Sequence, residues 1–505
     1  MTKSWQSLQN GSDIRGVASN GVSGESINLS AEIVEKIATA FVSWLSARKG
    51  IPTNYLTIAV GRDSRISGPD LMQAFKHGVL RTGANAVDCG LATTPAMFMS
   101  TIFDKTNYHG AVMLTASHLP FNRNGLKFFT CDGGLDKNDI TAILELAESA
   151  GIVEVVSSGS ESSFDIIQEY AGFLVNTIRK EVNHPTHFDT PLQGFHIIVD
   201  AGNGAGGFFA HQVLEPLGAI TKGSQFLNPD GMFPNHVPNP EDDTAMQFIQ
   251  RAVLQSNADL GIIFDTDVDR AAAVDHAGMS LNRNLLIALI SAIILEEHPG
   301  TTIVTDSITS DGLSNFITKD LNGIHHRFKR GYKNVINEAI RLNNEGKESW
   351  LAIETSGHAA LKENHFLDDG AFLMTKILIK LARLSLRGEN FHDLIDKMIM
   401  PAESQEYRIK IMTPDFKQYG NKVINELVLL VPGISGWQIV PDNYEGIRVS
   451  CNDESGDGWF LLRLSLHDPV MALNVESNKL GGINMIMNPL KLFLKSFADL
   501  NVPFE

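Results

Sequence analysis

Residues 112–127 read VMLTASHLPFNRNGLK, and an apolar run stops there at a small, polar turn. The turn, Thr115-Ala116-Ser117-His118, leads into a loop of Pro, Asn and Gly. This pattern is typical of a buried strand that ends in an exposed loop, where side chains are presented rather than packed. It therefore predicts an α/β layer with functional loops at the strand ends and places Ser117 at the centre of one loop.

The segment between Ser30 and Gly50 has the periodicity of a helix. Ser30 can cap a helix whose apolar residues recur on one face, and Gly50 can end it. The apolar stretch LTIAV (56–60) is then a predicted strand that opens onto GRDSRISG (61–68), and GLKFFT (125–130) is a further strand.

The same alternation restarts twice along the chain. Predicted strands that end in polar loops lie at 195–200, 260–264, 301–307 and 350–358. From PAESQEYRIK (401–410) onward the pattern changes, and the strands there predict a last unit of α+β character. The Ser/Gly-rich stretch VSSGSESS (156–163) and the segment near Pro401 are the expected linkers.

Composition limits the classes of function. The 505-residue chain is 43% hydrophobic and 20% charged, with a formal net charge of −17, which predicts several cores and disfavours binding to a long polyanion such as nucleic acid. A small anionic substrate needs only a local cluster of cations. Without a signal peptide or an 18-residue apolar run, we expect no membrane association and a cytoplasmic protein, or one of an organelle stroma if a leader has been removed.

The three cysteines support a reducing compartment. Cys89, Cys131 and Cys451 lie far apart and match no metal-ligand spacing. We interpret them as buried or neutral thiols.

Three carboxylates alternate in FDTDVDR (264–270), at the end of a predicted apolar strand. Asp265, Asp267 and Asp269 would repel one another unless a cation neutralised them, and an all-oxygen set favours Mg²⁺ over Zn²⁺. The alternative is a solvated acidic turn. An EF-hand is disfavoured, because Arg270 stands where that loop needs Gly and His276 where it needs Glu.

The stretch GNGAGG (202–207) matches the G-x-G-x-x-G pattern of dinucleotide sites. Such a site also needs an acidic residue at the end of the next strand, and the segment offers only Asp230, at the wrong distance. A tight strand-to-helix turn with close packing is therefore favoured over nicotinamide or flavin binding.

Several cations lie on short polar loops. Each one alone is as well explained by a surface ion pair, but together they could bind an anionic ligand. They are Arg15, Arg62, Arg65, Lys127, Arg270, Lys329, Arg330, Lys333 and Arg463.

Four of these stretches, in this order, resemble the signatures of the α-D-phosphohexomutase superfamily. TASHLPFNRNGLK (115–127) is similar to the phosphoserine loop T-A-S-H-N-P, and DTDVDR (265–270) matches the magnesium loop. ETSGH (354–358) matches the sugar-recognition loop, and RLSLHDP (463–469) occupies the place of the phosphate loop R-x-S-G-T-E-P.

The chain departs from the family pattern at a few positions. Leu119 replaces the usual Asn of the first loop, and Ile353 stands where Gly usually precedes Glu354. In the last loop Leu466, His467 and Asp468 replace Gly, Thr and Glu. A leucine removes backbone freedom where phosphate should approach amides, so His467 is a candidate replacement donor.

The resemblance implies four domains around a central cleft, of which three are similar α/β mixed-sheet units and the last is a smaller α+β domain. The expected boundaries are 1–160 with the phosphoserine loop, 161–280 with the metal loop, 281–398 with the sugar loop and 399–505 with the phosphate loop.

The resemblance also implies roles for individual residues. Ser117 carries the phosphoryl group and, with Asp265, Asp267 and Asp269, binds Mg²⁺. Arg15, Lys127 and Arg270 offset the phosphate charge, while His118 and Lys127 are both candidate proton acceptors. The expected substrate-binding residues are Glu354, Ser356, His358, Lys329, Lys333, Arg463, Ser465 and His467.

The implied activity is reversible phosphoryl transfer between hexose 1-phosphate and hexose 6-phosphate, as in phosphoglucomutase and phosphomannomutase, with a hexose 1,6-bisphosphate as intermediate and activator. A phosphoglucosamine mutase is the alternative within the family. A catalytically inactive regulatory homologue and a dinucleotide-dependent dehydrogenase are the alternatives from other classes. The sequence leaves the oligomeric state open.

Overall fold

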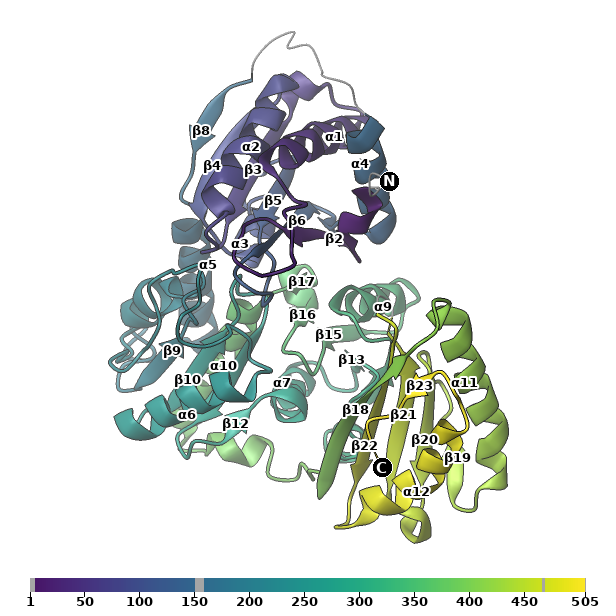
Figure 1. Cartoon of the computed structure of the whole chain (residues 1–505). Coiled ribbons are helices and arrows are strands. Elements are labelled where there is room, and N and C mark those ends of the chain that lie inside the picture. Colours follow the sequence, from purple (N-terminus) through teal and green to yellow (C-terminus); the bar gives the residue numbers. More distant parts are fainter. Residues whose placement is uncertain (1–4, 150–158, 466–467, 505) are drawn as a thin grey trace. The chain divides into compact units, whose positions relative to one another are not determined.

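The computed structural model describes residues 5–149, 159–465 and 468–504. Its residues cluster into two compact units, Met1–Leu286 with Ser356–Phe391 and Ile287–Thr355 with His392–Glu505. Figure 1 follows the chain from its purple N-terminal elements to its yellow C-terminal ones. No helix among the described residues is both long and apolar enough to span a membrane.

The first part of the first unit is a mixed sheet, in the order β1-β2-β6-β5-β3-β4-β8, with β7 beside β6. Its strands are β1 (Gln9–Asn10), β2 (Asp13–Val17), β3 (Thr57–Arg62), β4 (Asn85–Leu91), β5 (Gly110–Leu114), β6 (Arg123–Thr130), β7 (Gly133–Gly134) and β8 (Glu161–Ser163). Its helices are α1 (Ala31–Lys49), α2 (Gly68–Arg81), α3 (Thr94–Met99) and α4 (Lys137–Ser149).

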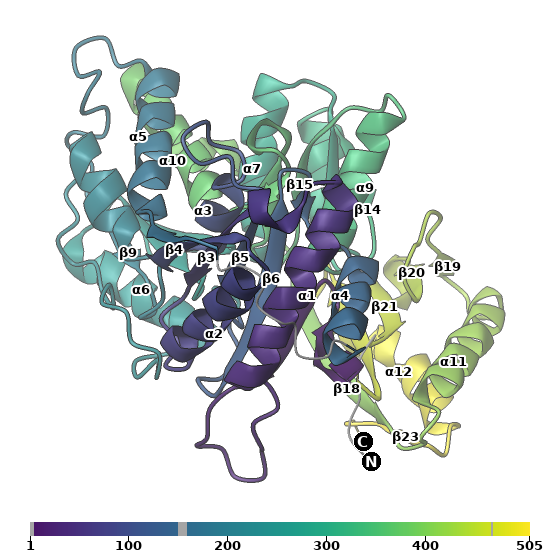
Figure 2. The same cartoon turned by 90° about the horizontal axis from the view of Figure 1, so that it is seen from above.

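Helix α1 confirms the helix expected between Ser30 and Gly50. The Ser30 side chain accepts a hydrogen bond from the amide of Ile33, and Gly50 ends the helix in the left-handed conformation, at φ 65°. The apolar face of α1 joins the core of this sheet, and α1 lies between α2 and α4 (Figure 2).

The stretch 156–163 is not wholly a linker. Residues 156–158 lie outside the described residues, but Glu161–Ser163 forms the strand β8, which pairs in parallel with β4. Backbone pairing at the edge of the sheet orders this Ser-rich segment, and its composition alone did not predict that pairing.

A second sheet of the first unit has the order β12-β11-β10-β9. Its strands are β9 (Ile197–Asp200), β10 (Leu260–Phe264), β11 (Ala271–Asp275) and β12 (Ser280–Leu281). Helices α5 (Ile166–Val182), α6 (Asp243–Ser256) and α10 (Gly370–Arg387) and the hairpin of β16 (Ala359–Leu361) and β17 (Leu367–Asp368) also belong to this unit.

The glycine-rich turn after β9 packs against the metal loop. A side chain at Gly204 would come within 2.6 Å of the backbone oxygen of Thr266, and the amide of Ala205 donates to that oxygen at 2.8 Å. This contact confirms the interpretation of GNGAGG as a closely packed turn.

The second unit contains parallel strands in the order β14-β13-β15 and, in its C-terminal part, a sheet in the order β19-β20-β21-β22-β18-β23. The elements of the first group are β13 (Thr302–Thr305), α8 (Asp311–Asn315), β14 (Ile324–Arg327), α9 (Tyr332–Asn344) and β15 (Ser349–Ile353), and α7 (Arg283–Glu297) precedes them. Those of the second are β18 (Glu403–Ile411), α11 (Phe416–Leu430), β19 (Trp437–Ile439), β20 (Ile447–Cys451), β21 (Gly458–Leu464), β22 (Val470–Ser477), α12 (Gly482–Lys495) and β23 (Leu500–Asn501).

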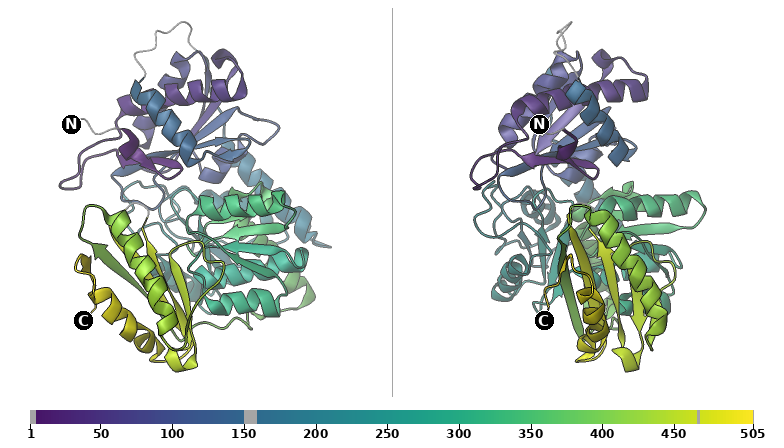
Figure 3. Two further views of the ribbon diagram at one scale, coloured as in Figure 1. Left: turned by 90° about the vertical axis from the view of Figure 1, so that its right-hand side faces the viewer. Right: turned by 45° about the vertical axis from the view of Figure 1, so that its right-hand side comes forward.

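The C-terminal sheet is antiparallel, as the predicted α+β character of this part requires. Helices α11 and α12 pack on one of its faces, where alternate strand residues such as Val449, Phe460 and Leu473 form the core (Figure 3). This alternation is the reason the strands could be recognised from sequence. The chain is thus a mixed α/β protein with three α/β parts and a fourth, largely antiparallel sheet.

Candidate active site

Ser117 lies just after β5, in a backbone conformation that few non-glycine residues adopt. Its φ is 50°, and the residue is 2% exposed. Its amide donates to Thr115 Oγ1 at 2.9 Å, and its hydroxyl donates to Asp265 Oδ2 at 2.9 Å. The turn therefore directs the hydroxyl at the carboxylates that follow β10.

Asp265, Asp267 and Asp269 are all buried, and one oxygen from each lies within 4.8 Å of the others. Val268 has a φ of 68°, so the loop turns between the second and third carboxylates. Burial, together with the charges of Asp269 and Asp267, holds the pKa of Asp265 well above its usual range. A cation at this point would relieve that repulsion.

Two carboxylate oxygens of this cluster bear on metal binding. Oδ1 of Asp267 and Oδ1 of Asp269 are buried and have no hydrogen-bond partner in the part of the chain that the structure describes. Buried carboxylate oxygens are rarely left unpaired, and an all-oxygen set suits Mg²⁺. These residues therefore fit the magnesium ion that the resemblance implies.

Two buried cations neutralise part of the carboxylate charge. Arg270 donates through Nη2 to Ser117 Oγ at 2.9 Å and to Asp265 Oδ2 at 3.1 Å. Lys127, on β6, forms ion pairs with Asp267 at 2.9 Å and with Asp269. Burial alone would raise the pKa of Asp269, but Lys127 and other nearby positive charges lower it below the usual value.

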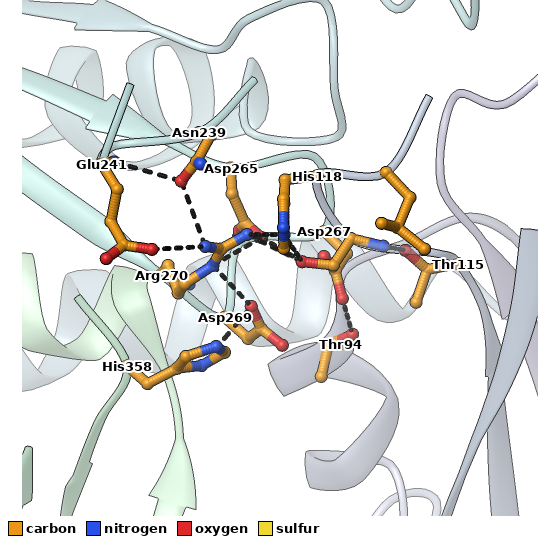
Figure 4. Close-up of polar contacts among 12 residues, drawn as sticks. Thr94, Thr115, His118, Asn239, Glu241, Asp265, Asp267, Asp269, Arg270 and His358 are labelled. Atoms are coloured by element: carbon orange, nitrogen blue, oxygen red, sulfur yellow. Dashed lines mark hydrogen bonds and ion pairs between the residues drawn. The ribbon is translucent and has the colours of Figure 1, made fainter. Parts of the chain in front are cut away.

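His118 is an uncharged partner of these groups. Its Nδ1 accepts a hydrogen bond from Arg270 Nη2 at 2.7 Å (Figure 4). Burial and the charges of Arg270 and Arg15 lower the pKa of His118 to about 3. A ring with so low a pKa is a poor proton acceptor at neutral pH. Arg15 itself, on β2, pairs with Asp13 at 2.9 Å.

His358 lies beside Asp269, the last of the three aspartates. Its Nδ1 contacts Asp368 and lies 3.8 Å from Asp269 Oδ1, and its backbone bridges to that of Arg270. Figure 4 shows the ring directed at Asp269. The preceding Ser356 is buried in the same unit. One unit therefore holds Ser117, the three aspartates, three cations predicted for the site (Arg15, Lys127 and Arg270) and two histidines.

The other predicted sugar and phosphate residues belong to the second unit. Glu354 accepts the amide of Gly331 at 2.5 Å, so it tethers the loop that carries Lys329 and leads to Lys333 in the first turn of α9. Lys329 is exposed. These contacts order the lysine-bearing loop within its own unit.

Arg463 is the penultimate residue of β21, and its Nη1 lies 3.7 Å from Glu445 Oε1. Glu445 also accepts hydrogen bonds from the Ser307 hydroxyl at 2.6 Å and from the amide of Arg330 at 3.1 Å. Ser465 follows and accepts the amide of Asp468 at 3.3 Å. His467 lies outside the described residues.

Sequence reasoning missed several residues that support the site. Thr94 donates from the start of α3 to Asp267 Oδ2 at 2.5 Å, and Asn239 accepts from Arg270 at 3.1 Å. Asp368 and Glu445 contact His358 and Arg463, respectively. Thr94 lies in a Thr-Thr-Pro helix start, but that pattern predicts only a cap, and its contact with Asp267 joins segments 173 residues apart.

The fold and the site define a class of α/β protein built for phosphoryl chemistry, with a buried serine beside carboxylates and cations. Profiles of phosphoglucomutase/phosphomannomutase alpha/beta/alpha domains I, II and III match residues 6–151, 172–278 and 282–400. These matches cover more than half of the chain, so the chain belongs to the α-D-phosphohexomutase superfamily, whose phosphoglucomutases and phosphomannomutases are isomerase-type phosphotransferases.

Individual relatives agree along nearly the whole length. A phosphoglucomutase of Neisseria gonorrhoeae is 28% identical over 92% of this chain and 94% of its own. A phosphomannomutase/phosphoglucomutase of Pseudomonas syringae is 29% identical over 97% and 96%. A crystal structure of a phosphoglucomutase/phosphomannomutase family protein from Burkholderia thailandensis superposes with a TM-score of 0.79, at 26% identity and with 99% of each chain covered.

Proposed function

We propose that this protein interconverts hexose 1-phosphate and hexose 6-phosphate, with Ser117 as the phosphoryl carrier and a hexose 1,6-bisphosphate as intermediate and activator. The single observation that carries the proposal is the position of the Ser117 hydroxyl, 2.9 Å from both Asp265 and Arg270 in a buried site. A nucleophile or leaving oxygen in this place meets a guanidinium and a metal-binding loop together.

The phosphoryl group moves twice in one cycle. In the first transfer the bond from phosphorus to Ser117 Oγ breaks, a bond to the free sugar hydroxyl forms, and the hydroxyl proton is released to an acceptor. The bisphosphate then reorients, the bond from its other phosphorus to the sugar oxygen breaks as a bond to Ser117 Oγ forms, and that sugar oxygen takes up a proton. Both transfers are favoured by in-line positioning and by positive charge around the three outer oxygens.

Residues of the first unit supply that charge. Arg270 contacts the carrier oxygen directly, and Lys127 and Arg15 add positive charge nearby. Asp265, Asp267 and Asp269 would hold Mg²⁺, which would supply Lewis-acid stabilisation of the phosphoryl charge. His118 serves as a neutral hydrogen-bond partner rather than as the proton acceptor.

Residues of the second unit, with Ser356 and His358, are proposed to bind the substrate. Glu354 and Ser356 suit neighbouring sugar hydroxyls, and His358 suits a hydroxyl or phosphate oxygen. Arg463 and Ser465 are assigned to the distal phosphate, with His467 as a candidate donor. Lys333 resembles the family's substrate-facing lysine, and Lys329 is the second candidate for that role.

The carrier assignment is tested with Ser117→Ala. We expect turnover to fall at least about 10³-fold, because no group on the enzyme can then hold the phosphoryl. Wild-type protein treated with glucose 1,6-bisphosphate should gain one phosphate on the peptide that contains Ser117, as measured by mass spectrometry.

The matched control is Ser149→Ala, at the exposed end of α4. The assay compares glucose 1-phosphate, mannose 1-phosphate and glucosamine 1-phosphate, each with its bisphosphate, so it also separates the phosphoglucosamine mutase from the other activities. Full turnover in Ser117→Ala would refute the assignment of Ser117 as the phosphoryl carrier. Absence of turnover of every substrate by the wild type would refute the proposed mutase activity.

A further inference from the structure

Arg65 is fully buried beneath the loop that follows Ser117. Its Nη2 donates to the carbonyl oxygens of Ser117 and, at 2.7 Å, of Leu119. Its Nη1 donates to the carbonyl oxygens of Pro120 at 2.7 Å and Arg123 at 3.0 Å. One guanidinium thus binds four carbonyl groups of the segment 117–123.

Asp63 completes the arrangement, and it too is fully buried. Its Oδ2 accepts from Arg65 Nε at 3.1 Å and from Thr115 Oγ1 at 2.7 Å, and its Oδ1 accepts the amide of Arg65 at 2.9 Å. Thr115 Oγ1 in turn accepts the amide of Ser117. A continuous chain of hydrogen bonds therefore runs from Arg65 through Asp63 and Thr115 to Ser117, in addition to the direct bond from Arg65 to the Ser117 carbonyl.

Only arginine can make this set of contacts. A guanidinium has five N–H groups in a rigid plane, and here the five bind five acceptors, namely Asp63 and the four carbonyls. A lysine has three donors and no plane. The loop is therefore matched to a planar donor and not only to a positive charge.

Thr115 and Arg65 bind the backbone of Ser117 at its amide and at its carbonyl oxygen, respectively. The amide of Ser117 is held by Thr115 and its carbonyl by Arg65, while its φ of 50° is an unfavourable conformation that only surrounding contacts can maintain. These two contacts fix the peptide planes that direct Oγ toward Asp265 and Arg270. Neither Asp63 nor Arg65 donates to the Ser117 hydroxyl in any contact that the structure describes.

We propose that Asp63 and Arg65 are positioning residues for phosphoryl transfer, which act through the Thr115 hydroxyl and the loop carbonyls to hold Ser117 in its reactive conformation. The inference rests on the proposed role of Ser117 as carrier. Loss of the hydrogen bonds that hold the Ser117 backbone should slow the transfer steps. It should leave substrate binding largely unchanged, because the sugar and distal-phosphate residues lie on other segments.

The test uses Thr115→Val, which keeps the shape and removes the hydroxyl, beside Thr115→Ser, which keeps the hydroxyl. We expect kcat of Thr115→Val to fall about 10- to 100-fold, the scale of a small misplacement of a reacting group, with KM changed less than about threefold. Thr115→Ser should retain most of the activity. Hydrogen exchange of the peptide 115–127 should rise in the valine variant.

Arg65→Lys is the second test, with Arg48→Lys on α1, whose side chain is half exposed, as its control. We expect a similar loss in kcat for Arg65→Lys and none for Arg48→Lys. Because both tested residues act through one loop, the double variant Arg65→Lys/Thr115→Val should lose less than the product of the two single losses.

Wild-type turnover and phosphorylation of Ser117 are measured in parallel, so a wrong assignment of Ser117 as carrier is recognised separately. If the wild type is phosphorylated and active, either of two results would contradict the positioning role of Asp63 and Arg65. One is unchanged kcat in both folded variants, and the other is a loss confined to KM. If Arg65→Lys does not fold, the pair at Thr115 decides, because that substitution removes a single hydroxyl.

Discussion

Asp267 combines two kinds of contact at one side chain. Oδ2 accepts from Thr94 and Lys127, while Oδ1 is buried without a partner in the described part of the chain. The paired oxygen fixes the orientation of the carboxylate, and one oxygen of Asp267 lies within 4.8 Å of oxygens of the other two aspartates. This geometry makes Asp267 the best single residue for testing metal binding.

Asp267→Asn keeps the size of the side chain and removes one negative charge. We expect Mg²⁺ affinity and turnover each to fall at least about tenfold, since a contact to a charged group is worth about 1.5–3 kcal/mol. Isothermal titration with Mg²⁺ and activity assays across Mg²⁺ concentrations measure the two effects. Asp243→Asn, an exposed carboxylate on α6, is the control.

Exhaustive chelation should abolish wild-type turnover, and added Mg²⁺ should restore it. Turnover that survives chelation, or an Asp267→Asn variant with wild-type metal affinity, would contradict a metal site formed by these aspartates.

At the scale of elements, the glycine-rich turn after β9 supports the metal loop after β10. The two strands are parallel neighbours, so the loops at their carboxyl ends meet. Close approach at Gly204 is possible only without a side chain, because a Cβ there would meet three backbone atoms of Thr266 at 2.6–3.0 Å. The glycine pattern thus serves packing beneath the carboxylates.

Gly204→Ala should therefore displace the metal loop. We expect Mg²⁺ affinity and kcat to fall about tenfold or more, as displacement of reacting groups by an ångström can cost 10²-fold. Gly172→Ala within α5 is the control, because a Cβ there meets nothing within 4 Å and should be tolerated. Equal metal affinity in the two variants would show that the turn does not support the site.

Glu476 on β22 is a buried carboxyl group whose charge depends on pH, and it contacts Trp459 on the neighbouring strand β21. Glu476 accepts from Trp459 Nε1 at 3.0 Å, and Arg448 stacks on the same indole at 3.5 Å from its centroid. Burial raises the pKa of Glu476 to about 7, and burial lowers that of Arg448 to about 9. For both side chains, desolvation therefore outweighs their mutual attraction.

This raised pKa has a defined consequence for stability. The folded state holds the proton of Glu476 more tightly than the unfolded state, so the free energy of unfolding should decrease as pH rises from about 4.5 through about 7. Glu476→Gln should lack that component, worth roughly 1–3 kcal/mol between pH 5 and 8. Urea unfolding of both proteins at several pH values measures it. Parallel pH profiles would contradict the raised pKa.

At the scale of the whole molecule, the candidate groups are divided between two units. The carrier, the carboxylates and Arg270 belong to the first, and the proposed phosphate residues Arg463 and Ser465 belong to the second. Substitutions should accordingly differ in their kinetic effect. Changes near the carrier should lower kcat, and changes at Arg463 should weaken substrate binding.

Arg463→Lys should raise KM for the sugar phosphate by about 10- to 150-fold and lower kcat much less, because a point charge cannot replace a planar fork. Arg408→Lys on β18, whose side chain is exposed, is the matched control. Steady-state kinetics of the three proteins provide the measurement. A loss mainly in kcat would place Arg463 at the transferring phosphate instead.

The α/β class, the α+β character of the last part, the cap and end of α1, and the family could be predicted from the sequence alone. These features depend on local order, because period-two and period-3.6 patterns, capping residues and short motifs are written in neighbouring positions. Ser117 and the three aspartates were predicted for the same reason, since each motif keeps its residues within one loop.

Only the tertiary structure revealed which groups the motifs meet. The five-acceptor arrangement of Arg65, the contact of Thr94 with Asp267, and β8 in the expected linker all join segments distant in sequence. The lowered pKa of His118 likewise depends on burial and on the charges of Arg270, which precedes β11, and of Arg15 on β2. Pairing, burial and charge are properties of neighbours in space, and a single sequence specifies them only through the fold.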